Sequence, residues 1–154
     1  MGFDAHRFAP EGSPRPLRLA CLTWPGTGVE ADSDGDVAVH ALADAFLSAA
    51  RLGDIGGLVG VGARSRGAGM SGEELLRTCV AELVRHGLRP VQASVVVIGN
   101  RPRIGSRRTE AEDVMSRVAG CRISLTATTT DGMGFTGRGE GLAAMATAMV
   151  SAGE

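Results

Sequence analysis

The chain contains no lysine and no tyrosine, and only four phenylalanines and one tryptophan among its 154 residues. All 16 basic residues are arginines, and 17 acidic residues bring the net charge to -1. This balance argues against a general nucleic-acid or membrane-surface binder. Because aromatic residues are scarce, the core must be built from valine, leucine, alanine and methionine. A surface whose only cations are guanidinium groups suits phosphate or carboxylate recognition, since each group binds such anions bidentately.

Long apolar runs and paired cysteines are also missing. No apolar stretch approaches the roughly 20 residues of a membrane-spanning helix. The N-terminal sequence MGFDAHRFAP carries charge at once and has no apolar leader region. Cys21, Cys79 and Cys121 are far apart and form no CxxC motif, so we interpret them as small apolar residues in a reducing compartment. The sequence thus predicts a cytoplasmic protein without a membrane partner.

The overall composition is that of one folded domain. Hydrophobic residues make up 44% and charged residues 21% of the chain, and a chain of this length buries roughly two-thirds of its unfolded surface. There is no internal repeat, low-complexity linker or break in composition. We therefore expect residues 1–154 to form a single α/β (α+β) domain, a small mixed sheet with helices on one side.

Local patterns divide the chain into strands and helices. β-Branched and alternating residues predict strands near 17–22, 91–98 and 123–130. Helices are predicted over 37–46, from a capping box at Ser71 and Glu74 to Gly87, over 109–118, and over 141–150. Segments 14–16, 24–28 and the glycine-rich 56–69 are predicted loops. The resulting order is strand, helix, helix, strand, helix, strand, helix.

Two histidines and an aspartate have the spacing of a metal site. Asp4 and His6 lie two residues apart, so in an extended segment their side chains point to the same side. His40 is carried by the helix that follows Asp34 and Asp36, and it is the candidate third ligand. Two imidazoles and a carboxylate with a fourth position open form a catalytic zinc site. The alternative is that these side chains are unrelated surface or hydrogen-bonded groups.

Hydroxyl groups end the strand predicted near 123–130. Thr128, Thr129 and Thr130 can hold phosphate oxygens, and Asp131 can hold a magnesium ion that bridges those phosphates. The alternative is that threonines are simply good strand formers. The glycine-rich stretch 134–141 follows, and it is typical of a loop that lets an anion approach the backbone closely.

A basic segment directly follows the strand predicted over 91–98. It consists of Gly99, Asn100, Arg101, Pro102 and Arg103. Such a segment can clasp a nucleotide or a phosphate group. A solvated run of charge explains it equally well.

Taken together, these segments resemble the 2-C-methyl-D-erythritol 2,4-cyclodiphosphate synthase family, whose members cyclise an intermediate of the non-mevalonate isoprenoid pathway. The matching blocks run in order along nearly the whole chain. They are GFDAH (2–6), SDGDVAVHAL (33–42), LGDIG (52–56), ATTT (127–130) and GFTGRGEG (134–141).

The resemblance implies a homotrimer with active sites between neighbouring subunits. It implies that zinc, or another divalent transition metal, is held by Asp4, His6 and His40. A second divalent metal such as Mg²⁺ or Mn²⁺ would be held with the substrate phosphates by Asp131 and Thr128–Thr130. The remaining implied substrate contacts are Ser33, the erythritol-binding Asp54, Ile55 and Gly56, the cytidine-binding segment 99–105, and Phe135 and Arg138 in an axial cavity that accepts an isoprenoid diphosphate.

The implied substrate is 4-diphosphocytidyl-2-C-methyl-D-erythritol 2-phosphate, which carries its own nucleophile. Its 2-phosphate oxygen attacks the β-phosphorus and expels CMP, closing the cyclic diphosphate. Positioning and charge neutralisation by two metals suffice for this step, so the absence of a nucleophile–base pair in the sequence fits it. Thr129 and Asp32 are the candidate catalytic residues.

Asp32 departs from the family pattern, which has a histidine before Ser-Asp-Gly-Asp. The segment after Gly56 also lacks the family's acidic loop and adds Arg64 and Arg66. A carboxylate repels substrate phosphate, so we expect Arg64 or Arg66 to pair with Asp32. Two alternatives therefore stay open: a diverged zinc-binding paralog that acts on another nucleotide diphosphate, and a non-catalytic trimer that binds an isoprenoid diphosphate.

Overall fold

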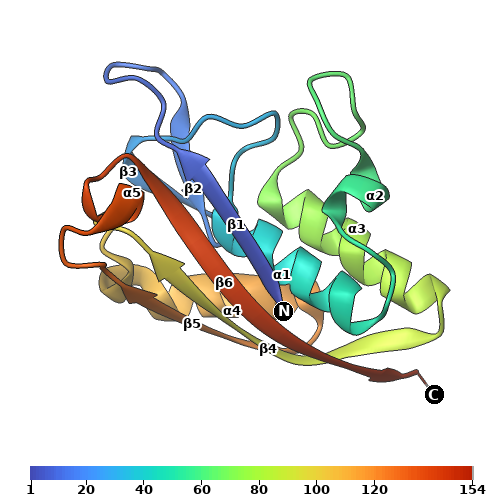
Figure 1. The fold of residues 1–154 in the computed structure, drawn as a ribbon. Helices are drawn as coiled ribbons and strands as arrows, with labels where there is room; N and C mark the ends of the chain where they lie inside the picture. Colours follow the sequence, from blue (N-terminus) through green and yellow to red (C-terminus); the bar gives the residue numbers. More distant parts are fainter. Residues whose placement is uncertain (154) are drawn as a thin grey trace.

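A four-stranded sheet with helices on one face forms the body of the protein (Figure 1). The computed structural model describes residues 1–153. The elements in chain order are β1 (Gly2–Arg7), β2 (Pro16–Leu19), β3 (Leu22–Thr27), α1 (Val37–Ala49), α2 (Ile55–Val59), α3 (Gly72–Arg85), β4 (Leu88–Ile98), a 3₁₀ helix (Ile104–Arg107), α4 (Arg108–Ala119), β5 (Arg122–Thr128), α5 (Gly134–Gly137) and β6 (Gly141–Ala152). The predicted α+β class with a mixed sheet is confirmed.

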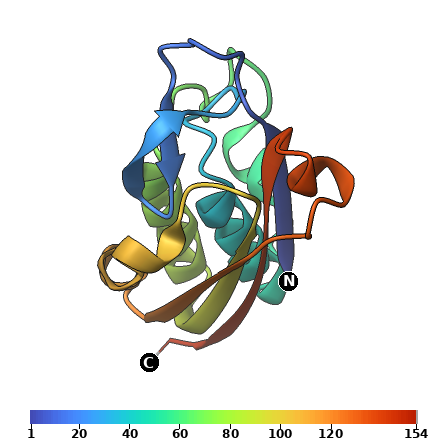
Figure 2. The same ribbon diagram turned by 90° about the vertical axis from the view of Figure 1, so that its left-hand side faces the viewer.

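The sheet order is β1-β6-β4-β5. Strand β6 pairs antiparallel with both β1 and β4, whereas β4 and β5 are parallel. The parallel pair is joined through α4, the crossover helix such a pair requires. Strands β2 and β3 form a separate two-stranded hairpin. Figure 2 shows this hairpin at the end of the molecule where α1 begins.

Helix α1 is the centre of the core. Its side chains from Val37 to Leu47 are buried except for Asp44, and Phe46 is fully enclosed. The helix begins at Asp36, whose side chain accepts a hydrogen bond from the Val39 backbone N–H. Helix α3 begins with the predicted capping box of Ser71 and Glu74, which is confirmed.

The predicted helix over 141–150 is wrong, because this segment is strand β6. Alanine, leucine and methionine favour helices, and that composition carried the prediction. In the fold, however, Leu142, Ala144 and Ala146 are buried, while Met145 and Met149 are exposed on the opposite face. The strand lies between β1 and β4, and small alanines allow α1 to pack closely on it. Tertiary packing therefore overrides the intrinsic preference.

The prediction of one strand near 17–22 and a loop over 24–28 is also wrong in part. Ala20 and Cys21 form a tight turn with φ values of 53° and 62°, so β2 and β3 are two arms of a hairpin. Trp24 to Thr27 belong to β3, and Pro16 belongs to β2. The predicted loop over 56–69 contains most of α2, and the glycine-rich stretch 134–141 leads into β6 rather than a helix.

The sheet face opposite the helices carries apolar side chains that no element within residues 1–153 covers. Phe3 pairs with Met145 across β1 and β6, and the two side chains are 55% and 40% exposed. Met149 continues this surface and is 55% exposed. Within residues 1–153, no helix is both long and apolar enough to cross a membrane. Cys21, Cys79 and Cys121 are free thiols.

Candidate metal centre and substrate pocket

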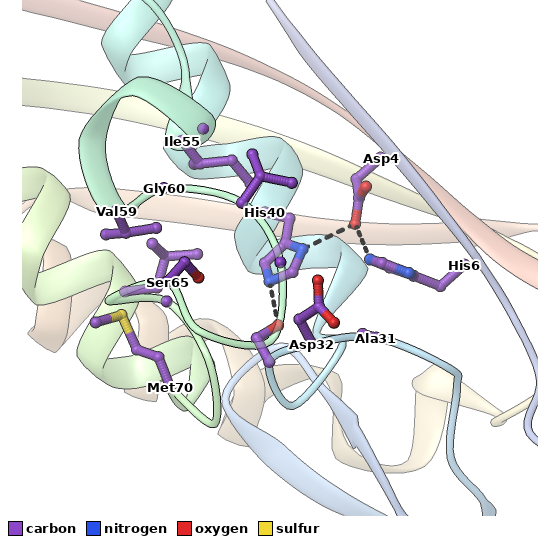
Figure 3. A pocket seen from close by; sticks show the side chains of 16 residues that line it. Asp4, His6, Ala31, Asp32, His40, Ile55, Val59, Gly60, Ser65 and Met70 are labelled. Atoms are coloured by element: carbon purple, nitrogen blue, oxygen red, sulfur yellow. Dashed lines mark hydrogen bonds and ion pairs between the residues drawn. The ribbon is translucent and has the colours of Figure 1, made fainter.

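Asp4, His6 and His40 meet at one point on the helix-covered side of the sheet (Figure 3). The Asp4 Oδ2 atom lies 3.0 Å from His6 Nε2 and 3.0 Å from His40 Nδ1. Strand β1 places Asp4 and His6 on the same side, and α1 brings His40 up to them. The candidate ligand atoms all lie within 4.8 Å of one another. The juxtaposition predicted from sequence spacing is confirmed.

This donor set fits a divalent transition metal. Two imidazole nitrogens and one carboxylate oxygen are the ligands of open, four-coordinate zinc sites. Burial alone raises the pKa of the Asp4 carboxyl, but hydrogen bonds and charge from His40 and His6 outweigh it and hold the pKa well below its usual range. Burial disfavours a charged His40, yet Asp4 raises the His40 pKa above its ordinary value. A cation at this point would therefore have to displace the proton that Asp4 favours on His40.

Ser33 supports the cluster from behind His40. Its Oγ lies 3.1 Å from His40 Nε2, whereas His40 Nδ1 faces Asp4. With a cation on Nδ1, Nε2 would carry the proton and would donate a hydrogen bond to Ser33 Oγ, and this bond would fix the orientation of the ring. The Gly35 backbone N–H also donates to Ser33 Oγ, at 3.2 Å. Ser33 was predicted as a substrate contact, and it lies in the pocket as well.

A pocket of about 230 Å³ opens beside this cluster. Its polar wall is formed by the cluster together with Asp32 and Ser33. Ile55, Val59 and Met70 form an apolar wall opposite the cluster (Figure 3). Val61 and Leu75 also line the pocket. Of the pocket residues outside the polar wall, only Ile55 and Gly56 were predicted from the sequence. The rest of the apolar wall was missed, because segment 56–69 was predicted to be a loop.

Asp54 has a local structural role next to the pocket. Its Oδ1 accepts a hydrogen bond from the Gly57 backbone N–H at 2.8 Å and caps α2. Asp44 on α1 accepts the Ile55 N–H at 2.8 Å. These two carboxylates fix the first turn of α2, which carries Ile55 and Gly56 into the pocket.

Asp32 faces the cluster without a cationic partner. Figure 3 shows its carboxylate directed towards the space between His6 and His40. No ion pair joins Asp32 to an arginine anywhere in residues 1–153, and Arg66 instead donates to the Leu58 carbonyl at 3.3 Å. The expected pairing with Arg64 or Arg66 is therefore wrong. Glycines with positive φ at 60, 62 and 69 let the segment fold back towards its own start. Its contact with Asp32 is a backbone hydrogen bond, from the Gly69 N–H to the Asp32 carbonyl at 2.9 Å.

The predicted phosphate- and nucleotide-binding segments lie elsewhere on the subunit. Ala5, Ala143, Ile98 and Thr128 stand side by side across the sheet. Three strand spacings therefore separate β1 from the start of the threonine run, about 14 Å. Thr129 Oγ1 donates to Asp131 at 3.2 Å, and Gly99 N–H donates to the Thr128 carbonyl at 3.0 Å. Within one subunit these two segments lie next to each other, but they do not reach the Asp4–His6–His40 cluster.

The segment with Phe135 and Arg138 adjoins the segment 99–103 that was predicted to bind the nucleotide. Asn100 Nδ2 donates to the Gly137 carbonyl at 2.9 Å. Arg138 forms an ion pair with Glu140 at 2.7 Å. Phe135 and Glu140 line a separate shallow depression with Ala5, His6 and Arg7. His6 lines both this depression and the pocket beside the cluster, whereas Phe135 and Glu140 line only the depression.

Asp36 is a buried carboxylate that sequence reasoning noted only as a helix start. It accepts backbone hydrogen bonds from Ala20 and Cys21 in the hairpin turn, at 2.8 and 2.7 Å, and from Val39 in α1. Burial, and then the charge of Asp34, raises the pKa of Asp36 to about 6 against the lowering effect of these donors. Asp36 thus ties the β2–β3 hairpin to the helix that carries His40.

Comparison with known proteins identifies the family. A family model, described as the YgbB family, matches residues 1–151. A 2-C-methyl-D-erythritol 2,4-cyclodiphosphate synthase from Bifidobacterium longum is 58% identical over 97% of this chain and 93% of its own length. The solved structure of a synthase of that name in a CDP-bound form superposes with a TM-score of 0.83, at 37% identity and with 97% of both chains covered. The bifunctional IspDF structure from Campylobacter jejuni has a TM-score of 0.88 and 33% identity over 98% of this chain, which spans 41% of that protein. With the matched fold, the metal-ligand cluster and these relatives in agreement, the chain belongs to the YgbB family.

Proposed function

We propose that the protein converts 4-diphosphocytidyl-2-C-methyl-D-erythritol 2-phosphate into 2-C-methyl-D-erythritol 2,4-cyclodiphosphate and CMP, as a phosphorus–oxygen lyase of isoprenoid biosynthesis. The observation that carries the proposal is the Asp4–His6–His40 cluster at the wall of a pocket, in a chain 58% identical to a synthase of that name. The free cysteines are compatible with a cytoplasmic location.

Asp4, His6 and His40 would hold Zn²⁺ or another divalent transition metal. A second divalent metal such as Mg²⁺ or Mn²⁺ would be held by Asp131, with Thr128, Thr129 and Thr130 on the phosphates. Bound cations supply charge neutralisation at the phosphoryl oxygens. The exposed hydroxyls and carboxylate of this second segment, 3.2 Å apart at Thr129 and Asp131, support that role.

In the reaction, an oxygen of the substrate's 2-phosphate forms a bond to the β-phosphorus. The bond from that phosphorus to the oxygen of the CMP group breaks, and CMP leaves with the electron pair. The chain's task is to bend the substrate so that both groups meet. Ile55 and Gly56 at the fixed start of α2 are suited to hold the erythritol part, and the segment Gly99 to Arg103 is suited to hold the cytidine phosphate.

A homotrimer would complete this site. In one subunit the threonine run lies about 14 Å across the sheet from β1, so a site that uses both needs a neighbouring copy. The uncovered apolar face with Phe3, Met145 and Met149 offers the surface for such an assembly. Phe135 and Arg138, at the margin of this sheet, would line an axial cavity for an isoprenoid diphosphate.

Turnover of the authentic substrate tests the proposal. Purified protein, loaded with Zn²⁺ and Mg²⁺, should release CMP, and His40→Ala and His6→Ala proteins should lose both zinc and activity. Ser48→Ala, a change at an exposed position of α1, is the matched control. Zinc content that is unchanged in both histidine variants would remove the metal assignment.

One observation favours a second candidate, a paralog that acts on another nucleotide diphosphate. The Asp32 carboxylate faces the cluster with no arginine in ion-pair contact among residues 1–153. Such a charge disfavours a substrate phosphate at that place. Turnover of a different nucleotide diphosphate, without cyclisation of the erythritol substrate, would support this candidate.

A further inference from the structure

Arg15 holds the polar wall of the pocket from outside. It lies between Pro14 and Pro16 in the connection from β1 to β2, and its Nη2 donates to the Ala31 carbonyl at 2.7 Å and also to the Ser33 carbonyl. The chain bends at Asp32 and Ser33, and the carbonyls of Ala31 and Ser33 both point to the guanidinium group. One guanidinium group can therefore bond both, and it does so across 16 and 18 positions of sequence.

The carbonyl between these two is held from the other direction. Asp32 O accepts the Gly69 N–H at 2.9 Å, and the Asp34 N–H donates to Met70 O at 3.1 Å. Segment 31–34 is thus clamped between Arg15 on one side and the end of the glycine-rich loop on the other. On the loop side the backbone bonds go to Gly69 and its neighbour Met70, and Asp34 Oδ2 accepts the Gly72 N–H at 2.7 Å. Among the described contacts, Arg15 is the only side chain that donates to the carbonyls of segment 31–34.

These hydrogen bonds to segment 31–34 fix the polar wall of the pocket. Ser33 Oγ contacts His40 Nε2 at 3.1 Å, and the Asp32 carboxylate faces the metal cluster. A shift of the Ser33 carbonyl moves the Ser33 hydroxyl with it, because both belong to one residue. The link from Arg15 to the metal ligand His40 therefore passes through a single residue.

We propose that Arg15 is a positioning residue, which sets the placement of Ser33 and Asp32 relative to the Asp4–His6–His40 cluster. The kinetic part of this inference rests on the proposed cyclisation, whereas the metal-binding part does not. Lysine is a poor substitute at this position. Its ammonium group is a flexible point charge, whereas the guanidinium group is planar and rigid and presents several donors.

Arg15→Ala and Arg15→Lys proteins test the inference, with Arg18→Ala, a change at an exposed position of strand β2, as the matched control. Zinc affinity is measured by competition with a chromogenic chelator, and KM and kcat are measured separately from CMP release. We expect zinc affinity to fall several-fold in Arg15→Ala, less than the roughly tenfold or greater loss for a residue that contacts a metal ligand directly, because Arg15 acts through Ser33. We expect KM to rise about tenfold. We expect Arg15→Lys to show the same losses to a smaller extent, and Arg18→Ala to behave as the wild type.

Chemical rescue separates positioning from a general loss of fold. Guanidinium ion at millimolar, non-denaturing concentration should restore zinc affinity and KM in Arg15→Ala and leave Arg18→Ala unchanged. The inference is overturned if folded Arg15→Ala and Arg15→Lys proteins keep wild-type zinc affinity and KM. It is also overturned if the losses in zinc affinity and KM are proportional to the decrease in Tm and guanidinium ion restores neither of them. If wild-type protein fails to release CMP, the proposed function fails, and zinc affinity with its rescue still decides the role of Arg15.

Discussion

Ser33 Oγ and His40 Nε2 lie 3.1 Å apart, on the side of the imidazole ring away from Asp4. This contact makes a hydroxyl group part of the support of the metal centre, because it fixes which ring nitrogen is free to bind. Ser33 also borders the pocket, so the same residue connects the proposed metal site to the proposed substrate pocket. The centre thus depends on a segment of chain that contributes no metal ligand.

Replacing Ser33 by alanine should weaken zinc binding. Without the Oγ acceptor, His40 loses the partner that orients its ring, and outer-shell losses of this kind lower metal affinity about tenfold or more. Chelator competition measures the change, and Ser48→Ala on the exposed face of α1 is the control. An affinity equal to that of the wild type would show that the ring is held by packing alone.

Replacing Asp36 by asparagine should destabilise the fold. The carboxylate accepts three backbone N–H bonds. In the asparagine variant, the side-chain NH₂ group replaces one of the two oxygens, so it faces a backbone N–H that then has no acceptor. One buried group left unsatisfied costs about 1–3 kcal/mol, which denaturant unfolding measures. Asp113→Asn, an exposed change on α4, is the control, and equal stability of the Asp36 variant would contradict this account of the hairpin anchor.

The loss of stability caused by Asp36→Asn should also depend on pH. Burial raises the pKa of Asp36 from 3.8 to about 6, so the folded state binds a proton more tightly than the unfolded state. Stability from this group is fully present below pH about 4 and is lost as pH rises through about 6. The stability difference between wild type and Asp36→Asn, measured in EDTA on both proteins, should therefore be larger at pH 4 than at pH 7. The opposite trend would mean that the N–H donors, rather than burial, dominate.

The sequence predicted the metal centre because each of its parts has a local signal. Asp4 and His6 share one side through strand periodicity, and His40 follows a helix start. Arg15 had no such signal, since its partners are backbone carbonyls 16 and 18 residues away, and carbonyls are the same in every residue. The predicted ion pair of Asp32 with Arg64 or Arg66 was wrong for a similar reason. The path of the glycine-rich loop determines which groups these arginines contact, and the sequence does not specify that path.

Strand β6 shows where composition misleads. Its alanines favour a helix in isolation, but Ala144 is completely buried between neighbouring strands and helix α1. Ala144→Leu should destabilise the protein by about 1–3 kcal/mol through overpacking. Ala152→Leu, at the exposed end of the same strand, should change stability little. Denaturant unfolding of both variants decides, and equal stabilities would mean that α1 is not closely packed on β6.

A charge on the uncovered sheet face should break the proposed trimer. Met145 is 40% exposed and pairs with Phe3, so Met145→Glu places a carboxylate in the proposed interface. We expect light scattering to show trimers for the wild type and smaller species for the variant. Zinc binding should persist because its ligands belong to one subunit, whereas CMP release should be lost. A wild-type monomer that turns over substrate would contradict the assembly.

The most direct test of the central claim is phosphorus NMR of wild-type protein with 4-diphosphocytidyl-2-C-methyl-D-erythritol 2-phosphate, Zn²⁺ and Mg²⁺, beside Asp32→His. We predict that the wild type forms the cyclic diphosphate and CMP in equal amounts, and that Asp32→His does so at a similar or higher rate. Zinc-loaded wild type that forms no cyclic product, with cyclisation restored only in Asp32→His, would show that this chain has left the reaction and that the pocket serves another nucleotide diphosphate.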